Sequence, residues 1–162
     1  MIMLKKFIVM AVTLAAIGSA ASAFAAVTGR EAEVIASKEV PMNAVNFGLA
    51  KEGSDYLVSF YDKETYRDFN VYVDSESGKV RMLNIKGSNT VGSTMLNKTE
   101  EDVKNAVLAK YPDARKLEVR LVQQGLNNRF YEATFSTEKF RMVEMEVSPV
   151  TCAFGKINIT YK

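Results

Sequence analysis

Carboxylates are the side chains of this chain best placed to do chemistry, because it contains no histidine. Asp62, Glu64 and Asp68 are closely spaced, and Asp74 and Glu76 follow. Paired carboxylates can act as general acid and base, and a group of them can bind calcium. Both groups lie between β-branched and aromatic runs, however, where polar residues are typical of solvated hairpin turns. We therefore predict turns, with no catalytic residue, metal site or cofactor.

The absence of histidine removes the commonest general base and a common metal ligand. Ser-His, Cys-His and the usual zinc sites cannot form. Gly78-Lys-Val and Gly155-Lys-Ile lack the spacing of a phosphate-binding loop. Glu144 and Glu146 alternate along an apolar run, as on the polar face of a strand. We expect a protein that is not an enzyme.

The single cysteine, Cys152, has no second cysteine with which to form an intramolecular disulfide. No histidine or strong cluster of positive charge lies near it in sequence to stabilise a thiolate. It falls in a turn predicted to match the one at Gly78, where a positive φ would strain any residue except glycine. We predict that Cys152 has no catalytic role and that Cys152→Gly is tolerated.

Residues 1–25 have the pattern of a secretory signal peptide. The basic pair 5–6 precedes an apolar run over 7–17, and small-residue cleavage sites end at Ala23 and Ala25. The apolar run is too short to span a membrane. We expect cleavage at one of the two sites and an exported bacterial protein, periplasmic or secreted.

The formal net charge of the chain comes from this leader. The chain holds 21 basic and 19 acidic residues, and two of the basic ones lie in the leader, so the remainder is formally neutral. A neutral chain of mixed charge gives no support to nucleic-acid binding or to membrane-surface binding.

Two segments carry the same order of structural signals. Thr28 and Thr99 each begin a predicted helix and have an acidic residue three positions later, as in a capping box. Pro41 and Pro112 end those helices at the same separation, and later matches are shifted by three more positions. A repeat of this length indicates two copies of a small domain.

Each copy is predicted to contain one helix followed by four strands. The helices cover residues 29–39 and 100–111, and the strands cover 45–49, 56–61, 69–73 and 79–86, then 117–121, 131–135, 142–147 and 156–161. We therefore predict an α+β fold of two tandem units, each with one helix packed on a four-stranded antiparallel meander. The units are 26–86 and 99–162, and a linker over 87–98 joins them.

The sequence Val-Tyr-Val-Asp74-Ser-Glu-Ser-Gly78-Lys-Val, after a capped helix and a proline, resembles the PepSY domain. That family typically has an Asp-x-x-x-Gly-like turn before a final Lys-Val strand. In the second copy Ser148 stands at the Asp position and Cys152 at the Gly position. The resemblance implies two PepSY-like, cystatin-like units that bind or restrain a peptidase. The tandem layout is also similar to that of proteinaceous β-lactamase inhibitors.

Alternation along the strands predicts an apolar outer face on the first unit. Matching strand 56–61 to strand 131–135 assigns Leu57, Ser59 and Tyr61 to the inner side. The candidate protein-binding face is then made of the outward residues Tyr56, Val58, Phe60, Tyr72, Val80 and Met82. The corresponding face of the second unit is polar. The apolar face could instead pack within the chain, against the linker or the mature N-terminus, or the assignment of strand faces could be shifted by one residue.

These patterns lead us to expect an exported, non-enzymatic PepSY-like protein that binds a protein or peptide partner in the cell envelope. A peptidase or other secreted enzyme is the partner that the resemblance implies. One alternative is a self-associating accessory component of an envelope complex, for example a homodimer. Another is a small-ligand carrier that uses the groove between helix and sheet.

Overall fold

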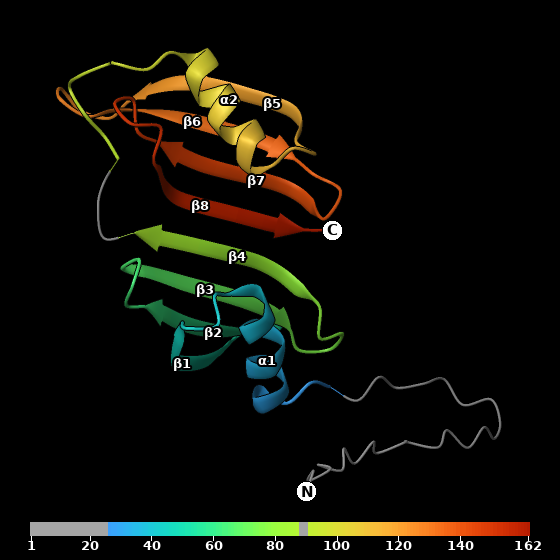
Figure 1. Cartoon of the computed structure of the whole chain (residues 1–162). Helices are drawn as coiled ribbons and strands as arrows, with labels where there is room; N and C mark the ends of the chain where they lie inside the picture. Colours follow the sequence, from blue (N-terminus) through green and yellow to red (C-terminus); the bar gives the residue numbers. More distant parts are fainter. Residues whose placement is uncertain (1–25, 88–90) are drawn as a thin grey trace, which may run out of the picture.

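The described residues of the computed structural model, 26–87 and 91–162, form one eight-stranded antiparallel sheet with two α-helices against one of its faces (Figure 1). The predicted signal peptide and residues 88–90 lie outside this description. No helix in the described part of the chain is long and apolar enough to cross a membrane. The elements follow in the order α1 (Gly29–Ala36), a 3-10 turn (Ser37–Glu39), β1 (Val45–Glu52), β2 (Asp55–Asp62), β3 (Arg67–Asp74), β4 (Val80–Gly87), α2 (Glu100–Lys110), β5 (Arg115–Gln123), β6 (Arg129–Ser136), β7 (Phe140–Val147) and β8 (Phe154–Tyr161).

The starts of both helices are fixed by the predicted capping boxes. The Thr28 hydroxyl accepts a hydrogen bond from the Glu31 amide, and the Glu31 carboxylate accepts one from the Thr28 amide. Thr99 and Asp102 repeat this arrangement at the start of α2. Each box satisfies amide groups that the first turn of a helix leaves without intrahelical partners.

The sheet order is β1-β2-β3-β4-β8-β7-β6-β5, so β4 and β8 lie side by side at its centre (Figure 1). Their antiparallel pairing joins Leu83 to Ile159, Asn84 to Asn158 and Ile85 to Ile157. The predicted fold of two tandem units, each with its own four-stranded sheet, is therefore wrong. The final strands of the two segments pair with each other and merge them into one sheet.

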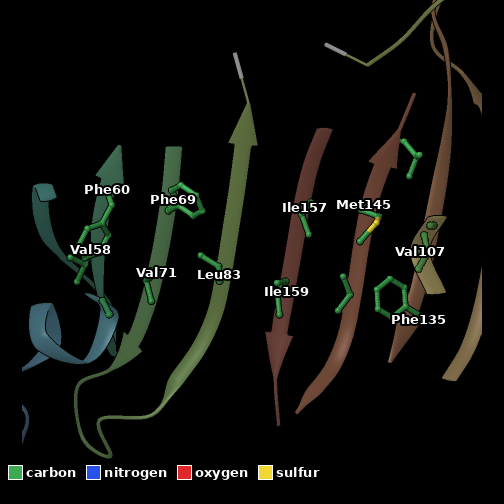
Figure 2. Packing of buried hydrophobic residues seen from close by; sticks show 14 of the residues in the cluster. Val58, Phe60, Phe69, Val71, Leu83, Val107, Phe135, Met145, Ile157 and Ile159 are labelled. Carbon is green, nitrogen blue, oxygen red and sulfur yellow. The ribbon is translucent and has the colours of Figure 1, made fainter. Parts of the chain in front are cut away.

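The core is likewise continuous across the junction of β4 with β8. The buried apolar residues of the described chain form a cluster that takes in both helices, with Ala32 and Ala36 from α1 and Val103 and Val107 from α2. Figure 2 shows the sheet's contribution to this cluster on either side of the β4–β8 junction: Val58, Phe60, Phe69, Val71 and Leu83, then Ile157, Ile159, Met145 and Phe135. Each fully buried aliphatic or aromatic side chain contributes about 1.5–3 kcal/mol.

Polar contacts also connect the two halves. The Glu39 carboxylate, at the end of the 3-10 turn, accepts hydrogen bonds from Lys139 Nζ at 2.8 Å and from the Tyr161 hydroxyl at 2.6 Å. The Arg67 guanidinium donates to the Phe154 carbonyl at 2.8 Å. Burial and this carboxylate neighbour raise the pKa of Tyr161, so its hydroxyl remains a donor. These contacts fix the second half against the first.

Candidate interaction surface

The sheet has a helix-covered side and an open side, and the predicted binding residues are divided between them. Val58 pairs with Val71 and Phe60 with Phe69. Val58 is 0% exposed and Phe60 is 3% exposed, because both point into the core beneath the helices. Their predicted place on an outer face is therefore wrong.

The error comes from a hairpin that differs by one residue between the two halves. The paired core residues Phe60 and Phe69 are nine positions apart, whereas Phe135 and its partner Val143 are eight apart. Applying one fixed offset to both strands of the hairpin therefore shifts β2 by one position. A shift of one residue reverses every side chain of a strand.

The four other residues predicted for this face lie on different sides of the sheet. Tyr56 and Val80 are partly buried and pack against the core cluster. Tyr72 and Met82 lie opposite each other on neighbouring strands, on the open face of the sheet. The candidate face thus keeps Tyr72 and Met82 and loses the others.

A row of apolar side chains, interrupted by Thr160, crosses the open face along the strand pairing. Leu57 lies opposite Tyr72, Tyr72 opposite Met82, Met82 opposite Thr160, and Thr160 opposite Met142. Met82 is 38% exposed and Met142 is 50% exposed. Sequence reasoning placed Leu57 on the inner side and described the corresponding face of the second unit as polar, so it did not connect Met142 with Tyr72 and Met82. The cross-strand register supplies that connection.

Beside this row, the open face of the second half carries four carboxylates: Glu118, Glu132, Glu144 and Glu146. Glu132 lies directly opposite Glu146, a like-charge pairing that destabilises a sheet. Arg120 forms an ion pair with Glu132. The other three carboxylates make no ion pair within the described part of the chain.

A hollow of about 630 Å³ lies among these side chains. Glu118, Glu132 and Glu144 line it together with Lys104 of α2, Arg120, Met142 and neighbouring residues of β5 and β6. A second hollow of about 450 Å³ shares Glu118 and Met142 and continues to Lys116, Arg141 and Thr160. The surface therefore has a groove with carboxylates beside an exposed methionine.

Of the carboxylates predicted to lie in turns, Glu64 and Glu76 do so, whereas Asp62 and Asp74 end strands β2 and β3 and Asp68 lies within β3. Asp62 accepts hydrogen bonds from the Thr65 hydroxyl at 2.6 Å, the Glu64 amide and the Asn43 side chain, and the Thr65 hydroxyl is the main cause of its lowered pKa. The Asp62 side chain is 2% exposed, whereas residues 63–66 of the turn itself are exposed, as predicted. Asp74 accepts from the Ser77 amide and hydroxyl, which lower its pKa, and it lies 3.6 Å from Arg81. Within the described residues, no group of three or more potential ligands is arranged to hold a metal ion.

The turns at Gly78 and Cys152 have the same local geometry. Gly78 has φ 68° and donates its amide to the Asp74 carbonyl, and Cys152 has φ 58° and donates to the Ser148 carbonyl. The Ser148 hydroxyl accepts from two turn amides, as the Asp74 carboxylate does. Partial burial raises the pKa of the Cys152 thiol, which keeps it protonated. The predicted correspondence of the two turns is confirmed.

No family model matches the chain, and no curated protein matches it significantly. Two solved structures are similar to it at low levels. A DUF2874 family protein from Bacteroides uniformis has 14% identity and a TM-score of 0.32, with 80% of this chain and 87% of that protein covered. A protein from Bacteroides eggerthii, described as a candidate periplasmic protein, has 16% identity and a TM-score of 0.32, with coverage of 80% and 88%. Likeness at this level assigns neither family nor function.

Proposed function

We propose that this protein is an exported, non-enzymatic binding protein whose open sheet face receives a protein or peptide partner. The observation that carries the proposal is the apolar row formed by Leu57, Tyr72, Met82 and Met142. A solvated face of an antiparallel sheet usually carries polar side chains. A contiguous exposed apolar surface with a polar rim is typical of an interaction site.

Export follows from the signal-peptide pattern of residues 1–25. The cell envelope is then the compartment in which the partner is met, in the periplasm or outside the cell. The non-enzymatic role is supported by Asp62 and Asp74, whose carboxylates are engaged in hydrogen bonds within their own turns.

The PepSY-like turns make a secreted peptidase the first class of partner to test. Asp74 to Gly78 has the spacing of the family's turn, and Ser148 to Cys152 repeats its hydrogen bonding with different side chains. A protein partner restrained by contact needs no reactive group on this chain. The proposal is therefore compatible with the absence of histidine.

Photo-crosslinking from defined positions tests the proposal. A photoreactive phenylalanine analogue would replace Tyr72 on the open face or, as a control, Leu108, which is 41% exposed on α2. In envelope extract of the producing organism, we expect a discrete adduct with another polypeptide at position 72 and none at 108. Met82→Ser should reduce the adduct.

Three outcomes contradict the proposal. No adduct at position 72 would remove the open face as a binding site, and equal adducts at both positions would show unspecific contact. An adduct only between two copies of this chain would favour the self-associating alternative.

A further inference from the structure

We propose that a second site, on the helix-covered side of the sheet, binds a phosphate group between Arg67, Lys110 and Tyr111. The inference goes beyond the proposed function, because the site lies on the side of the sheet opposite the open face and takes a ligand of another class. The observation that carries it is a group of hydrogen-bond donors, contributed by both halves, that meets at Phe154 and has few acceptors of its own.

The strand order and the two helices bring these residues together. α1 packs mainly on β2 and β3, and α2 mainly on β5 and β6, so the central strands β4 and β8 lie between the two helices (Figure 1). Arg67 begins β3 and alternates with the buried residue Phe69, which places its side chain on the helix-covered side. Lys110 ends α2, and Phe154 begins β8. The site therefore lies where the two halves of the sheet join.

Phe154 is the residue at which both cations meet. Lys110 Nζ lies 5.0 Å from the centre of the Phe154 ring and 5.8 Å from the centre of the Tyr111 ring. Arg67 Nη2 donates a hydrogen bond to the Phe154 carbonyl at 2.8 Å. Lys110 is exposed and the other three residues are partly exposed, so a ligand from solvent can reach them.

The donors of this site lack acceptors. Within the described residues, neither Lys110 Nζ nor the Tyr111 hydroxyl makes a hydrogen bond, and the Arg67 side chain makes only the one to Phe154. A lysine in the last turn of a helix often donates to the terminal carbonyl groups of that helix, but the Lys110 ammonium group lies over the Phe154 ring instead. Burial raises the pKa of Tyr111, which keeps its hydroxyl protonated and able to donate. Most of the donor capacity of the site is therefore free for a ligand.

The site also brings two positive charges together. Neither Arg67 nor Lys110 takes part in an ion pair in the described part of the chain. Burial and the positive charge of Arg67 lower the pKa of Lys110, and no carboxylate acts to raise it. Asp62, opposite Arg67 on β2, is held by donors of its own turn, and Glu39, which also connects the halves, is paired with Lys139. A bound anion would relieve the repulsion between the two cations.

The kinds of donor favour phosphate over carboxylate. A guanidinium group presents parallel N–H groups that match two phosphate oxygens, and an ammonium group binds another oxygen as a point charge. The Tyr111 hydroxyl supplies one more donor. A phosphate offers oxygens in several directions, whereas a carboxylate offers only two in one plane. Donors that come from β3 and from the end of α2 are therefore best matched by phosphate.

Titration with inorganic phosphate tests the inference. Thermal unfolding of the purified protein would be followed as phosphate replaces chloride at constant ionic strength, and a saturable rise in melting temperature gives the dissociation constant. We expect that constant to increase about tenfold in Lys110→Gln and about fivefold in Tyr111→Phe, which removes a donor without changing the charge. Lys104→Gln, on the same helix, makes the same change in charge as Lys110→Gln and should alter the constant less than about twofold.

No saturable rise, an equal loss of affinity in Lys104→Gln, or an unchanged affinity in Tyr111→Phe would overturn the inference. Acetate that stabilises the protein as strongly as phosphate would also overturn it, because the site would then take carboxylates. Glycerol phosphate distinguishes the source of the group. Tighter binding than that of inorganic phosphate supports a phosphate carried by a larger molecule, such as a lipid headgroup, and equal or weaker binding supports the free ion.

This inference and the proposed function fail separately. Crosslinking at Tyr72 tests the open face, and phosphate titration tests the opposite side of the sheet, so neither result decides the other.

Discussion

The two halves of the sheet carry the same kind of side chain toward the helices and different kinds on the open face. Under the helices, Val58 and Val71 in the first half correspond in environment to Ala133 and Met145 in the second, and all four are buried. On the open face, the first half presents Leu57 and Tyr72, whereas the second presents mainly polar and charged side chains, four of them carboxylates. Packing against helices restricts one side of both halves, and the open side is free to differ.

Substitutions at two neighbouring residues of β2 should show the largest difference in stability between the two sides of the sheet. Val58→Asp would place an unpaired charge in the core, and we expect it to cost more than about 4 kcal/mol or to prevent folding. Leu57→Asp, on the open side, should change the free energy of unfolding by no more than about 1 kcal/mol. Urea denaturation of both variants measures the difference, and similar losses would contradict the assigned strand parity.

The β4–β8 junction gives the next largest effect. Leu83 and Ile159 face each other there and are each 4% exposed. Leu83→Ala and Ile159→Ala should each lower the free energy of unfolding by about 2–4 kcal/mol. Because the halves share one core, we expect a single unfolding transition in both variants. Separate transitions in calorimetry would show that the halves behave as independent domains.

The two capping boxes test how alike the two halves are, because we expect the loss of either box to lower the stability by the same amount. Thr28→Ala and Thr99→Ala should each destabilise the protein by about 1 kcal/mol. A large difference between the two variants in thermal unfolding would show that only one helix start matters.

The same boxes predict a dependence on pH. Hydrogen bonds from Thr28 lower the pKa of Glu31 below its ordinary 4.5, and those from Thr99 lower that of Asp102 below 3.8. At these two carboxylates the folded state therefore binds protons more weakly than the unfolded state. The stabilisation that follows is complete above the ordinary pKa values and is lost as the pH falls through the lowered pKa values. Asp102→Asn should be less stable than the natural chain at pH 7, and the difference should narrow as the pH falls through the lowered pKa of Asp102. Urea unfolding at several pH values measures it, with Glu101→Gln as a control for helix charge alone.

The smallest effect concerns the matched turns. Cys152→Gly should stabilise the protein by up to about 1 kcal/mol, because glycine adopts a positive φ without strain. Gly78→Ala should destabilise it by about 1 kcal/mol or more for the same reason. Thermal unfolding of both variants is the measurement. A loss of stability in Cys152→Gly would mean that the packing of the thiol against the core outweighs the strain.

Local signals in the sequence predicted local structure well. Thr28, Thr99 and the two prolines located both helices to within a few residues, and Gly78 predicted the turn that Cys152 repeats. These features depend on residues close together in the chain. Capping and turn conformation can therefore be read without knowledge of the fold.

The sheet's continuity and the open face could not be read in this way. The pairing of Asn84 with Asn158 joins residues 74 positions apart, and the last strand of a meander has no local sign of what pairs with its free edge. The prediction of the candidate face was wrong because the corresponding hairpins of the two halves differ in length by one residue. This difference placed Val58 and Phe60 on the wrong side of β2. The members of the apolar row, Leu57, Tyr72, Met82 and Met142, are connected only by register across the five strands β2, β3, β4, β8 and β7.

The central position of β4 has a consequence for how the chain is made. During synthesis β4 is complete long before β8, its partner, has emerged. Until then β4 is an unpaired strand with Leu83 and Ile85 on one side, and such strands readily pair with other chains. The closing of β4 against β8 spans the longest sequence separation of any strand pair in the sheet, which makes it a slow step in folding. The risk of aggregation during refolding is therefore greatest while the first half has formed and β8 has not yet paired with β4.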